Sequence, residues 1–415
     1  MIIPAVIQQH TDDAASLASN RLALVEAPHA RLDQLNRFDR RLAAHLTGLR
    51  LSGEEGWAFC EATLETPSLG AMFAIAVTAL EERDDTRLAR IFALAQAVPE
   101  TIAGLVSAFE WVEPTRLHGT VASLLRDRDG FRRMVGMAAC AMHRVDPGLA
   151  SGEFFRDADR TVRSRSLRAA GELGLSGAMS SCVATLTDAD EDYRFWSAWS
   201  AVLLGDRSRG VDVLTQCGLS PGAHRARAFR LALQAMGTSE AHDVLQQLAK
   251  SPHRARWLIQ GSGIVGDPAY FPWLVKKMGE LPTARLAGEA FSTIAGVHLG
   301  QAALDRPAPE NFESGPNDDP DDPNVEADPD EGLPWPDVAK IEAWWAANGS
   351  RFTPGGRYFM GAPVTRMHCI EVLKNGYQRQ RILAAHYLCL LEPGTPLFNT
   401  SAPAPRQQRR LVQTT

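Results

Sequence analysis

The 415-residue chain is poor in aromatic residues and contains no long hydrophobic run. Aromatic residues make up 7% of it, and clusters of Val, Ile, Thr and Tyr are scarce, whereas Ala, Leu and Arg dominate. This composition disfavours an all-β fold and favours helices. The longest apolar run, Ala71 to Leu80, is about half of the roughly 20 residues that a membrane-spanning helix needs. The sequence therefore predicts no association with a membrane.

Regular cysteine spacing and an export signal are also missing. None of the six cysteines lies in C-x-x-C spacing, which argues against a disulfide framework. The N-terminus turns polar at Gln8 and has neither the basic start nor the small-residue cleavage site of a signal peptide. We therefore expect a cytoplasmic protein with reduced thiols.

The chain lacks a strong basic charge, and its acidic charge is concentrated in one stretch. The formal net charge is -6, but acidic residues gather between Pro307 and Asp337, where there is no Lys or Arg, so the rest of the chain is mildly basic. A nucleic-acid partner is not expected, because such proteins need a concentrated basic face. The acidic stretch is rich in proline and includes Asp318 to Pro323, which favours an irregular linker or docking tail. It lacks the residue order of a calcium-binding loop.

Glycines recur after helix-like stretches at intervals of about 30 residues, a period typical of a solenoid. These glycines are Gly174, Gly205, Gly237, Gly266 and Gly296. Continuing the ladder towards the N-terminus leads to Val145, Val112 and Glu81. Between the anchors, apolar residues follow the i, i+3, i+4, i+7 spacing of one helical face. One such set is Met179, Cys182, Val183 and Leu186.

Each repeat is expected to consist of two helices joined by a tight turn, with the glycine ending a helix in a left-handed conformation. One hairpin cannot bury the apolar faces of both helices, so neighbouring hairpins must stack. The predicted fold class is all-α, an α-solenoid of helical hairpins with a helical N-terminal cap and a small helical C-terminal region. The expected segments are 1–56 for the cap, 57–304 for the repeats, 305–336 for the acidic Pro-rich linker or loop, 337–392 for the C-terminal helices, and 393–415 for a loop-like tail.

Three patterns resemble chemical sites, but their surroundings favour structural roles. Gly261 to Gly266 has the letters of a dinucleotide-binding fingerprint, G-x-G-x-x-G, yet it follows a predicted helix instead of a strand. Gly218 to Gly222 has the letters of a nucleophile elbow, G-x-S-x-G, yet it falls in a loop between helices. Four possible zinc ligands are His368, Cys369, His386 and Cys389. Their apolar neighbours favour burial instead. We therefore predict no catalytic, cofactor-binding or metal-binding residue.

Two resemblances to known families point to the kind of repeat and to its setting. The unit from Asp188 to Asp206 resembles HEAT-like repeats of the phycobilin-lyase type. Much of the chain is also similar to a bacterial family of HEAT-repeat proteins whose genes occur in type VI secretion clusters and which has no assigned catalytic motif. The residues that carry this similarity are Leu35 to Arg50, Trp344-Trp345, Arg351-Phe352, Gly356 to Tyr358 and Gln378 to Ala385. The resemblance implies HEAT-like hairpins and an association with secretion machinery.

The fold and the resemblance together lead to the hypothesis of a non-catalytic protein-binding scaffold. It would be an adaptor or chaperone for a type VI effector or spike component, bound through surface complementarity. The alternatives are an immunity protein that occludes a cognate toxin and a lyase-like enzyme of the HEAT-repeat type. Arginine far outnumbers lysine among the 43 basic residues, and guanidinium groups suit carboxylate partners, although they can also pair within the repeats. The predicted protein-binding residues are Arg194, Trp199, Trp257, Trp344, Trp345, Arg351, Phe352, Arg357 and Tyr358.

Overall fold

The computed structural model describes residues 3–149, 152–250, 252–310, 312, 315 and 328–413. The predicted acidic block from 318 to 323 lies outside the described residues. The chain forms two compact units, a first unit of Met1–Gly210 with Lys374–Thr415 and a second unit of Val211–Leu373. The stretch 57–304, predicted as one solenoid, thus contributes to both units, and so does the predicted C-terminal region 337–392.

Helices account for nearly all the regular structure of the first unit. Its α-helices are α1 (Pro4–Leu24), α2 (Leu32–Leu51), α3 (Gly53–Ala62), α4 (Leu69–Glu82), α5 (Asp85–Ala97), α6 (Ile102–Trp111), α7 (Pro114–Leu124), α8 (Gly130–His143), α9 (Arg160–Leu173), α10 (Met179–Ala184), α11 (Glu191–Leu203), α20 (Gln378–Leu391) and α21 (Ala404–Gln413). Short 3-10 helices are η1 (Thr63–Glu65), η2 (Pro99–Thr101), η4 (Phe154–Arg156) and η5 (Ser176–Ala178). The chain passes between the units in α12 (Arg209–Leu219) and α19 (Arg366–Asn375).

The second unit adds two small antiparallel sheets to its helices. The helices are α13 (Arg225–Ala235), α14 (Thr238–Ala249), η6 (Pro252–Arg254), α15 (Ala255–Val265), η7 (Pro268–Tyr270), α16 (Phe271–Met278), α17 (Ala284–Ala295), α18 (Val338–Asn348) and η8 (Gly349–Arg351). Strand β1 (Asp305–Arg306) pairs with β2 (Trp335–Pro336), and β3 (Tyr358–Phe359) pairs with β4 (Ala362–Pro363). Asp337 accepts a hydrogen bond from the Lys340 backbone N–H and so begins α18 at the position that the sequence predicted.

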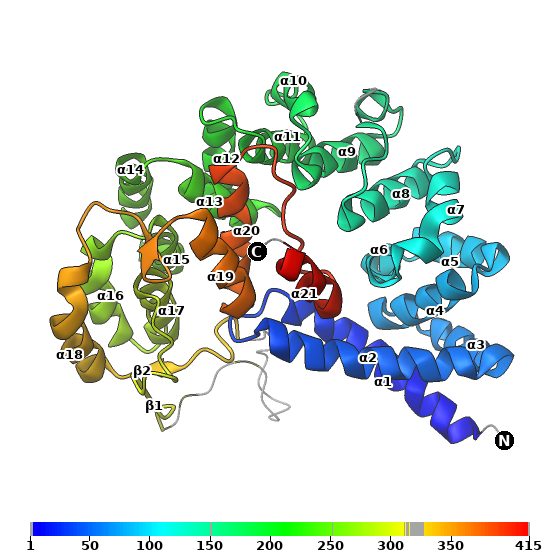
Figure 1. Ribbon diagram of the computed structural model, residues 1–415, viewed down its shortest axis with the longest axis horizontal. Helices are drawn as coiled ribbons and strands as arrows, with labels where there is room; N and C mark the ends of the chain where they lie inside the picture. Colours follow the sequence, from blue (N-terminus) through cyan, green and yellow to red (C-terminus); the bar gives the residue numbers. More distant parts are fainter. Residues whose placement is uncertain are drawn as a thin grey trace. The chain divides into compact units, whose positions relative to one another are not determined.

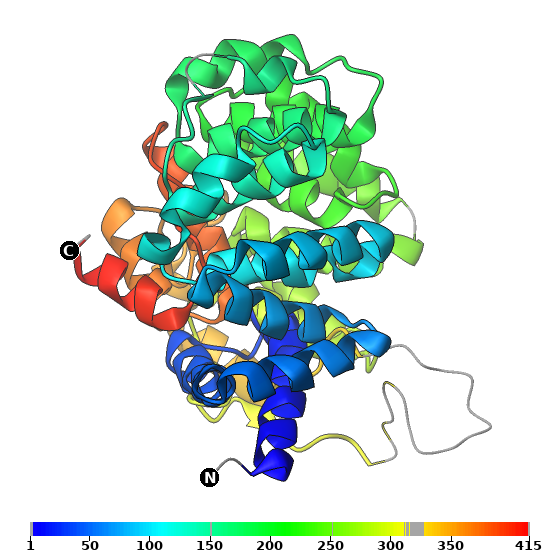
Figure 2. The ribbon, with the colours of Figure 1, turned by 90° about the vertical axis from the view of Figure 1, so that its right-hand side faces the viewer.

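The predicted all-α solenoid is confirmed within each unit. In the first unit α4, α6, α8, α9 and α11 pack one against the next around an arc (Figure 1), and Figure 2 shows the N-terminal helices as successive layers. In the second unit α13, α15 and α17 stack in the same order. We call these the inner helices. About half or more of the residues of each are buried, and in α4 every residue from Gly70 to Leu80 is buried. Their ends follow one another at about 30 residues, the predicted repeat length.

The left-handed turns that end the inner helices agree with most of the predicted ladder. Gly174, Gly266 and Gly296 have φ of 68°, 77° and 72° and directly follow α9, α15 and α17. Upstream, Arg83 and Arg144 take the same conformation, two residues after Glu81 and one before Val145.

Gly237 is an exception, and its expected role was wrong. Its φ is -64°, and it lies at the N-terminus of α14, where its N–H donates to Glu240 Oε2 at 3.1 Å. Glycine adopts either sign of φ, so its position in the sequence did not distinguish the end of one helix from the start of the next.

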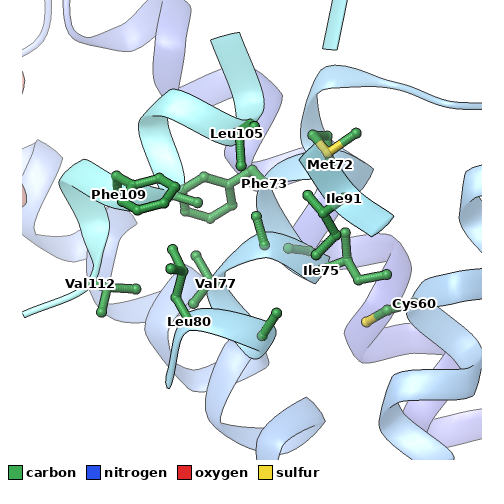
Figure 3. Close-up of a cluster of buried hydrophobic side chains, with 14 of the residues drawn as sticks. Cys60, Met72, Phe73, Ile75, Val77, Leu80, Ile91, Leu105, Phe109 and Val112 are labelled. Atoms are coloured by element: carbon green, nitrogen blue, oxygen red, sulfur yellow. The ribbon is translucent and has the colours of Figure 1, made fainter. Parts of the chain in front are cut away.

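The apolar stripes of α4 and α6 meet in the core of the first unit (Figure 3). Phe73 on α4 and Leu105 and Phe109 on α6 lie together there, each at most 3% exposed. This core belongs to two repeats at once, as expected of hairpins that are stable only when stacked.

The C-terminal tail is partly helical, and the prediction of a loop-like tail after 393 was wrong. In α21 the buried residues Ala404, Gln407 and Leu411 lie three and four positions apart, on one helical face. The Ala404 N–H donates to Asp39 Oδ2 of α2 at 2.7 Å, which satisfies one free donor at the start of the helix. Pro405 stands in the first turn, where a missing N–H costs nothing. The tail therefore folds against another helix, which its own sequence does not indicate.

Candidate protein-binding surface

The tryptophan pair predicted to bind a partner packs onto the core of the second unit. Trp344 and Trp345 are half-buried on α18. Their rings contact Phe291 and Phe271 edge-on, with ring centroids 5.5 Å and 4.0 Å apart. The pair therefore holds α18 against α16 and α17 and leaves only part of each ring accessible.

The arginine and aromatic residues that follow α18 bind the ends of inner helices. The Arg357 guanidinium donates to the carbonyl oxygens of Leu233, Gln234 and Met236, at 3.0, 2.6 and 2.9 Å. The Tyr358 N–H donates to the Gly266 carbonyl at 2.8 Å. These carbonyls are the acceptors that a helix C-terminus leaves without an intrahelical partner. Arg357 and Tyr358 thus complete α13 and α15.

The remaining predicted residues are divided between the two units. Phe352 is buried beside the Tyr358 ring, with centroids 5.0 Å apart, whereas its neighbour Arg351 is exposed. Trp257 is half-buried in the second unit, where the Arg225 guanidinium lies 4.1 Å from the centroid of its ring. In the first unit Trp199 is 5% exposed, and the Arg194 side chain donates to the Asp188 carbonyl at 2.7 Å. The structure gathers Trp344, Trp345, Phe352 and Tyr358 around one core and leaves Arg194 and Trp199 in the other unit.

Arg357 and Arg351 provide a matched pair for testing this assignment. Replacing Arg357 with alanine removes three hydrogen bonds from the end of α13, so we expect the free energy of unfolding to fall by about 1–3 kcal/mol. Arg351→Ala removes an exposed side chain and should change it by less than about 0.5 kcal/mol. Urea unfolding followed by circular dichroism measures both. Equal losses in the two variants would contradict the assignment.

The tail of the chain binds the inner-helix ends of the first unit in a similar way. We call residues 390–407 the tail segment; it lies on the inner side of the arc (Figure 1). Arg406 donates to the Glu110 carbonyl at the end of α6 at 2.6 Å, and the Leu397 N–H donates to the Glu172 carbonyl of α9 at 3.0 Å. The Leu397 carbonyl accepts from Arg144 Nε, which follows α8, at 2.7 Å. A partner cannot reach these helix ends without displacing the tail segment.

Glu172 links the tail segment to a buried cluster of charges. Its carboxylate oxygens accept from Arg165 at 2.8 Å and from Arg168 at 2.9 Å. Burial on its own would raise the pKa of Glu172, but the positive charges of Arg165, Arg168 and Arg144 outweigh it and lower the pKa to about 2. Burial lowers the pKa of Arg165 to about 10, although the charge of Glu172 opposes this. Glu172 therefore stays ionised at neutral pH and stabilises the folded first unit.

An open groove lies in the first unit between α5 and α7, two helices that are not among the inner helices. Its volume is about 390 Å³. The side chains of Leu88, Phe92 and Leu124 form its floor, and three arginines line it. These are Arg83 after α4, Arg116 on α7 and Arg132 on α8. We call this hollow the arginine groove. Sequence reasoning did not single out any of its residues.

A second hollow of about 670 Å³ continues the arginine groove along α7. The two hollows share Gly119, Ser123 and Asp127, and the second adds Arg126 and Arg128. The two hollows together are thus lined by five arginines and two aspartates, Asp85 and Asp127. The Asp127 carboxylate accepts a hydrogen bond from the Asp129 N–H at 2.9 Å, and its Oδ2 lies 3.4 Å from Arg132 Nη1. The surface along α7 carries an excess of positive charge.

Gly119 lines the arginine groove and has no side chain that would fill it. It lies inside α7, is exposed, and a Cβ atom built on it would meet nothing within 4 Å. Glycine inside a helix costs roughly 0.5–1 kcal/mol relative to alanine. Neither packing nor a left-handed backbone within the described chain requires a glycine at this position.

Gly119→Ala is therefore expected to stabilise the protein by about 0.5–1 kcal/mol. Gly171→Ala provides the contrast, because its Cβ would lie 2.6 Å from Ser200 Oγ and 2.9 Å from Ser200 Cα where α9 packs on α11. That variant should be destabilised. The midpoints of chemical unfolding rank the two, and a loss of stability in Gly119→Ala would mean that the position has a packing role.

The glycine patterns that resemble chemical sites have structural roles. Gly261 and Gly263 lie within α15, where a Cβ would come to 2.5 Å from Leu245 Cδ2 and 3.0 Å from Ala290 Cα. Gly218 lies near the end of α12, although 218–222 was predicted as a loop, and its Cβ would come to 2.7 Å from the Cα of Phe229. These glycines let helices approach one another closely.

The possible zinc ligands do not form a cluster in the part of the chain that the structure describes. Among those residues no group of three or more His, Cys, Asp or Glu side chains is arranged to hold a metal ion. Burial raises the pKa of Cys369 and of Cys389 to about 12, so both thiols stay protonated at neutral pH. The His368 imidazole Nε2 lies 2.8 Å from the Phe359 carbonyl oxygen.

Comparisons with protein-family models, with curated proteins and with solved structures found no match to this chain. Among the described residues no helix is both long and apolar enough to span a bilayer.

Proposed function

We propose that this chain is a non-catalytic protein-binding scaffold that serves as an adaptor or chaperone for a type VI effector or spike component. The observation that carries the scaffold role is the arginine groove with its adjoining hollow, an open surface on stacked helical hairpins. Stacked hairpins of this kind commonly present extended binding surfaces. The type VI setting rests on the family resemblance of the sequence.

The groove supports this role because rigid helices position it. Arg116 and Gly119 stand on α7, and Leu88 and Phe92 on α5, so these two helices fix the walls of the groove before a partner binds. Binding then avoids the entropic cost of ordering the backbone of these two helices. Arginine is also a frequent anchor residue in protein interfaces.

Affinity capture from the bacterium that carries the gene tests the proposed function. The tagged chain, expressed at its native level and cross-linked before lysis, should retain a product of the neighbouring secretion genes. A tagged unrelated solenoid of similar size provides the background. Quantitative mass spectrometry that finds no secretion component above this background would refute the type VI assignment.

Co-expression with candidate toxins separates the adaptor from the immunity protein. An adaptor should leave the toxicity of the effector that it carries unchanged when both are made in the cytoplasm of a test host. Rescue of growth would favour the immunity alternative, in which the bound surface of the toxin includes its active site.

A further inference from the structure

We infer that the arginine groove binds an acidic segment of the partner protein, with carboxylates on its arginines. This inference rests on the proposed scaffold function and adds the chemistry of the bound segment. In the groove, helix geometry, uncompensated positive charge and free space coincide.

Charge is the first argument for an acidic occupant. Arg116 is exposed and, among the described residues, its guanidinium makes no hydrogen bond or ion pair; the same holds for Arg126 and Arg128. Arg83 and Arg132 are tied to the Thr115 carbonyl and to Asp127. Three guanidinium groups thus remain available on α7 and in the turn that follows it, and each can bind a carboxylate through two parallel hydrogen bonds.

The placement of Asp127 favours a polypeptide over a nucleic acid. This carboxylate belongs to both hollows and so lies where they join. It would repel a continuous phosphate backbone, which offers no hydrogen-bond donor. A peptide, in contrast, brings N–H groups that a carboxylate can accept.

Gly119 provides an argument independent of charge. A helix interior that has glycine where alanine would be more stable, and where a Cβ would meet no atom, has space that the folded chain itself does not use. That space lies over the floor of the groove, between the arginines. A backbone or side chain of the partner can approach the backbone of α7 closely at this position.

Selection from a library of random displayed peptides against the immobilised full-length chain tests the inference. We expect the enriched peptides to be rich in Asp and Glu. A fluorescein-labelled peptide made from the consensus should bind in solution, as measured by fluorescence anisotropy. Enrichment of basic or uncharged peptides would overturn the inference.

Two groove variants and one matched control locate the binding site. Gly119→Trp fills the groove and Arg116→Glu reverses a charge. Each should lower the affinity for the consensus peptide by at least about tenfold. Gly177→Trp makes the same change at another exposed glycine with nothing within 4 Å, in η5, and should leave binding unchanged. Thermal unfolding checks that all three fold. Unchanged binding in both groove variants would overturn the inference.

Further controls separate this inference from the proposed function. If labelled oligothymidylate binds more tightly than the peptide and loses binding in Gly119→Trp, the groove is a nucleic-acid site and the inference fails. If a captured secretion protein binds Gly119→Trp and Arg116→Glu as tightly as the unaltered chain, the inference fails while the scaffold function stands. If peptides bind as expected but no secretion protein is captured, the groove chemistry stands and the type VI assignment fails.

Discussion

Asp39→Ala is expected to destabilise the protein by about 3–5 kcal/mol, because it leaves the buried charge of Arg21 without its partner. Both side chains are buried, and Asp39 Oδ1 lies 2.7 Å from Arg21 Nε. Asp39 Oδ2 also accepts the N–H of Ala404 at the start of α21. The substitution therefore breaks the ion pair and also removes the hydrogen bond to the start of α21.

The exposed pair on the same helix is the control for this variant. Asp33 and Arg37 lie 3.2 Å apart on α2 with side chains 68% and 73% exposed, so Asp33→Ala should cost less than about 1 kcal/mol. Chemical unfolding monitored by fluorescence and by circular dichroism gives both free energies. A loss in Asp39→Ala as small as that in Asp33→Ala would show that the buried pair does not hold the tail.

Glu172→Gln is expected to destabilise the protein by a similar amount, about 3–5 kcal/mol, since it removes the negative charge from a buried group of arginines. The double variant Glu172→Gln/Arg165→Met removes a buried charge of each sign and should recover part of the loss. A double variant less stable than Glu172→Gln would mean that Arg165 stabilises the fold through contacts other than its pairing with Glu172.

The same carboxylate gives the protein a defined acid sensitivity. The pKa of Glu172 is about 2 when folded and 4.5 for an ordinary glutamate, so the unfolded chain takes up a proton first as pH falls. Its contribution to stability is therefore complete above pH 4.5 and disappears as pH falls towards 2. Unfolding free energies measured across this window should fall less steeply for Glu172→Gln than for the unaltered chain. Parallel curves would show that another group controls the acid transition.

Local periodicity was enough to predict the repeats. Apolar spacing gives the buried face of each helix, and a glycine after the stripe marks where the helix ends, as at Gly174 and Gly266. Arg83 and Arg144 adopt the same left-handed conformation although neither is a glycine. The sequence alone does not indicate this conformation. The second N-terminal cap helix was predicted for the same reason as the repeats, because its apolar residues form one clear stripe.

The role of the C-terminal residues depends on contacts that are distant in sequence. Arg357 binds carbonyls of α13, and Arg406 binds carbonyls of α6, each more than a hundred positions away. An arginine beside aromatic residues has the same local pattern whether it anchors a partner or completes a helix of its own chain. The arginine groove had one local signal, a glycine in the middle of the helix 114–124, but the free space around it appears only once α5 and α7 are placed.

Hydrogen–deuterium exchange on the chain alone and with its captured partner tests whether the tail segment stays bound to the inner helices while the arginine groove binds the partner. The amides of Leu397 and Ala404 should exchange slowly in both states, since they donate to Glu172 and Asp39 inside the first unit. Binding should add protection in α5 and α7. Rapid exchange in the tail segment of the free chain, with protection appearing there and not at the groove on binding, would contradict the account.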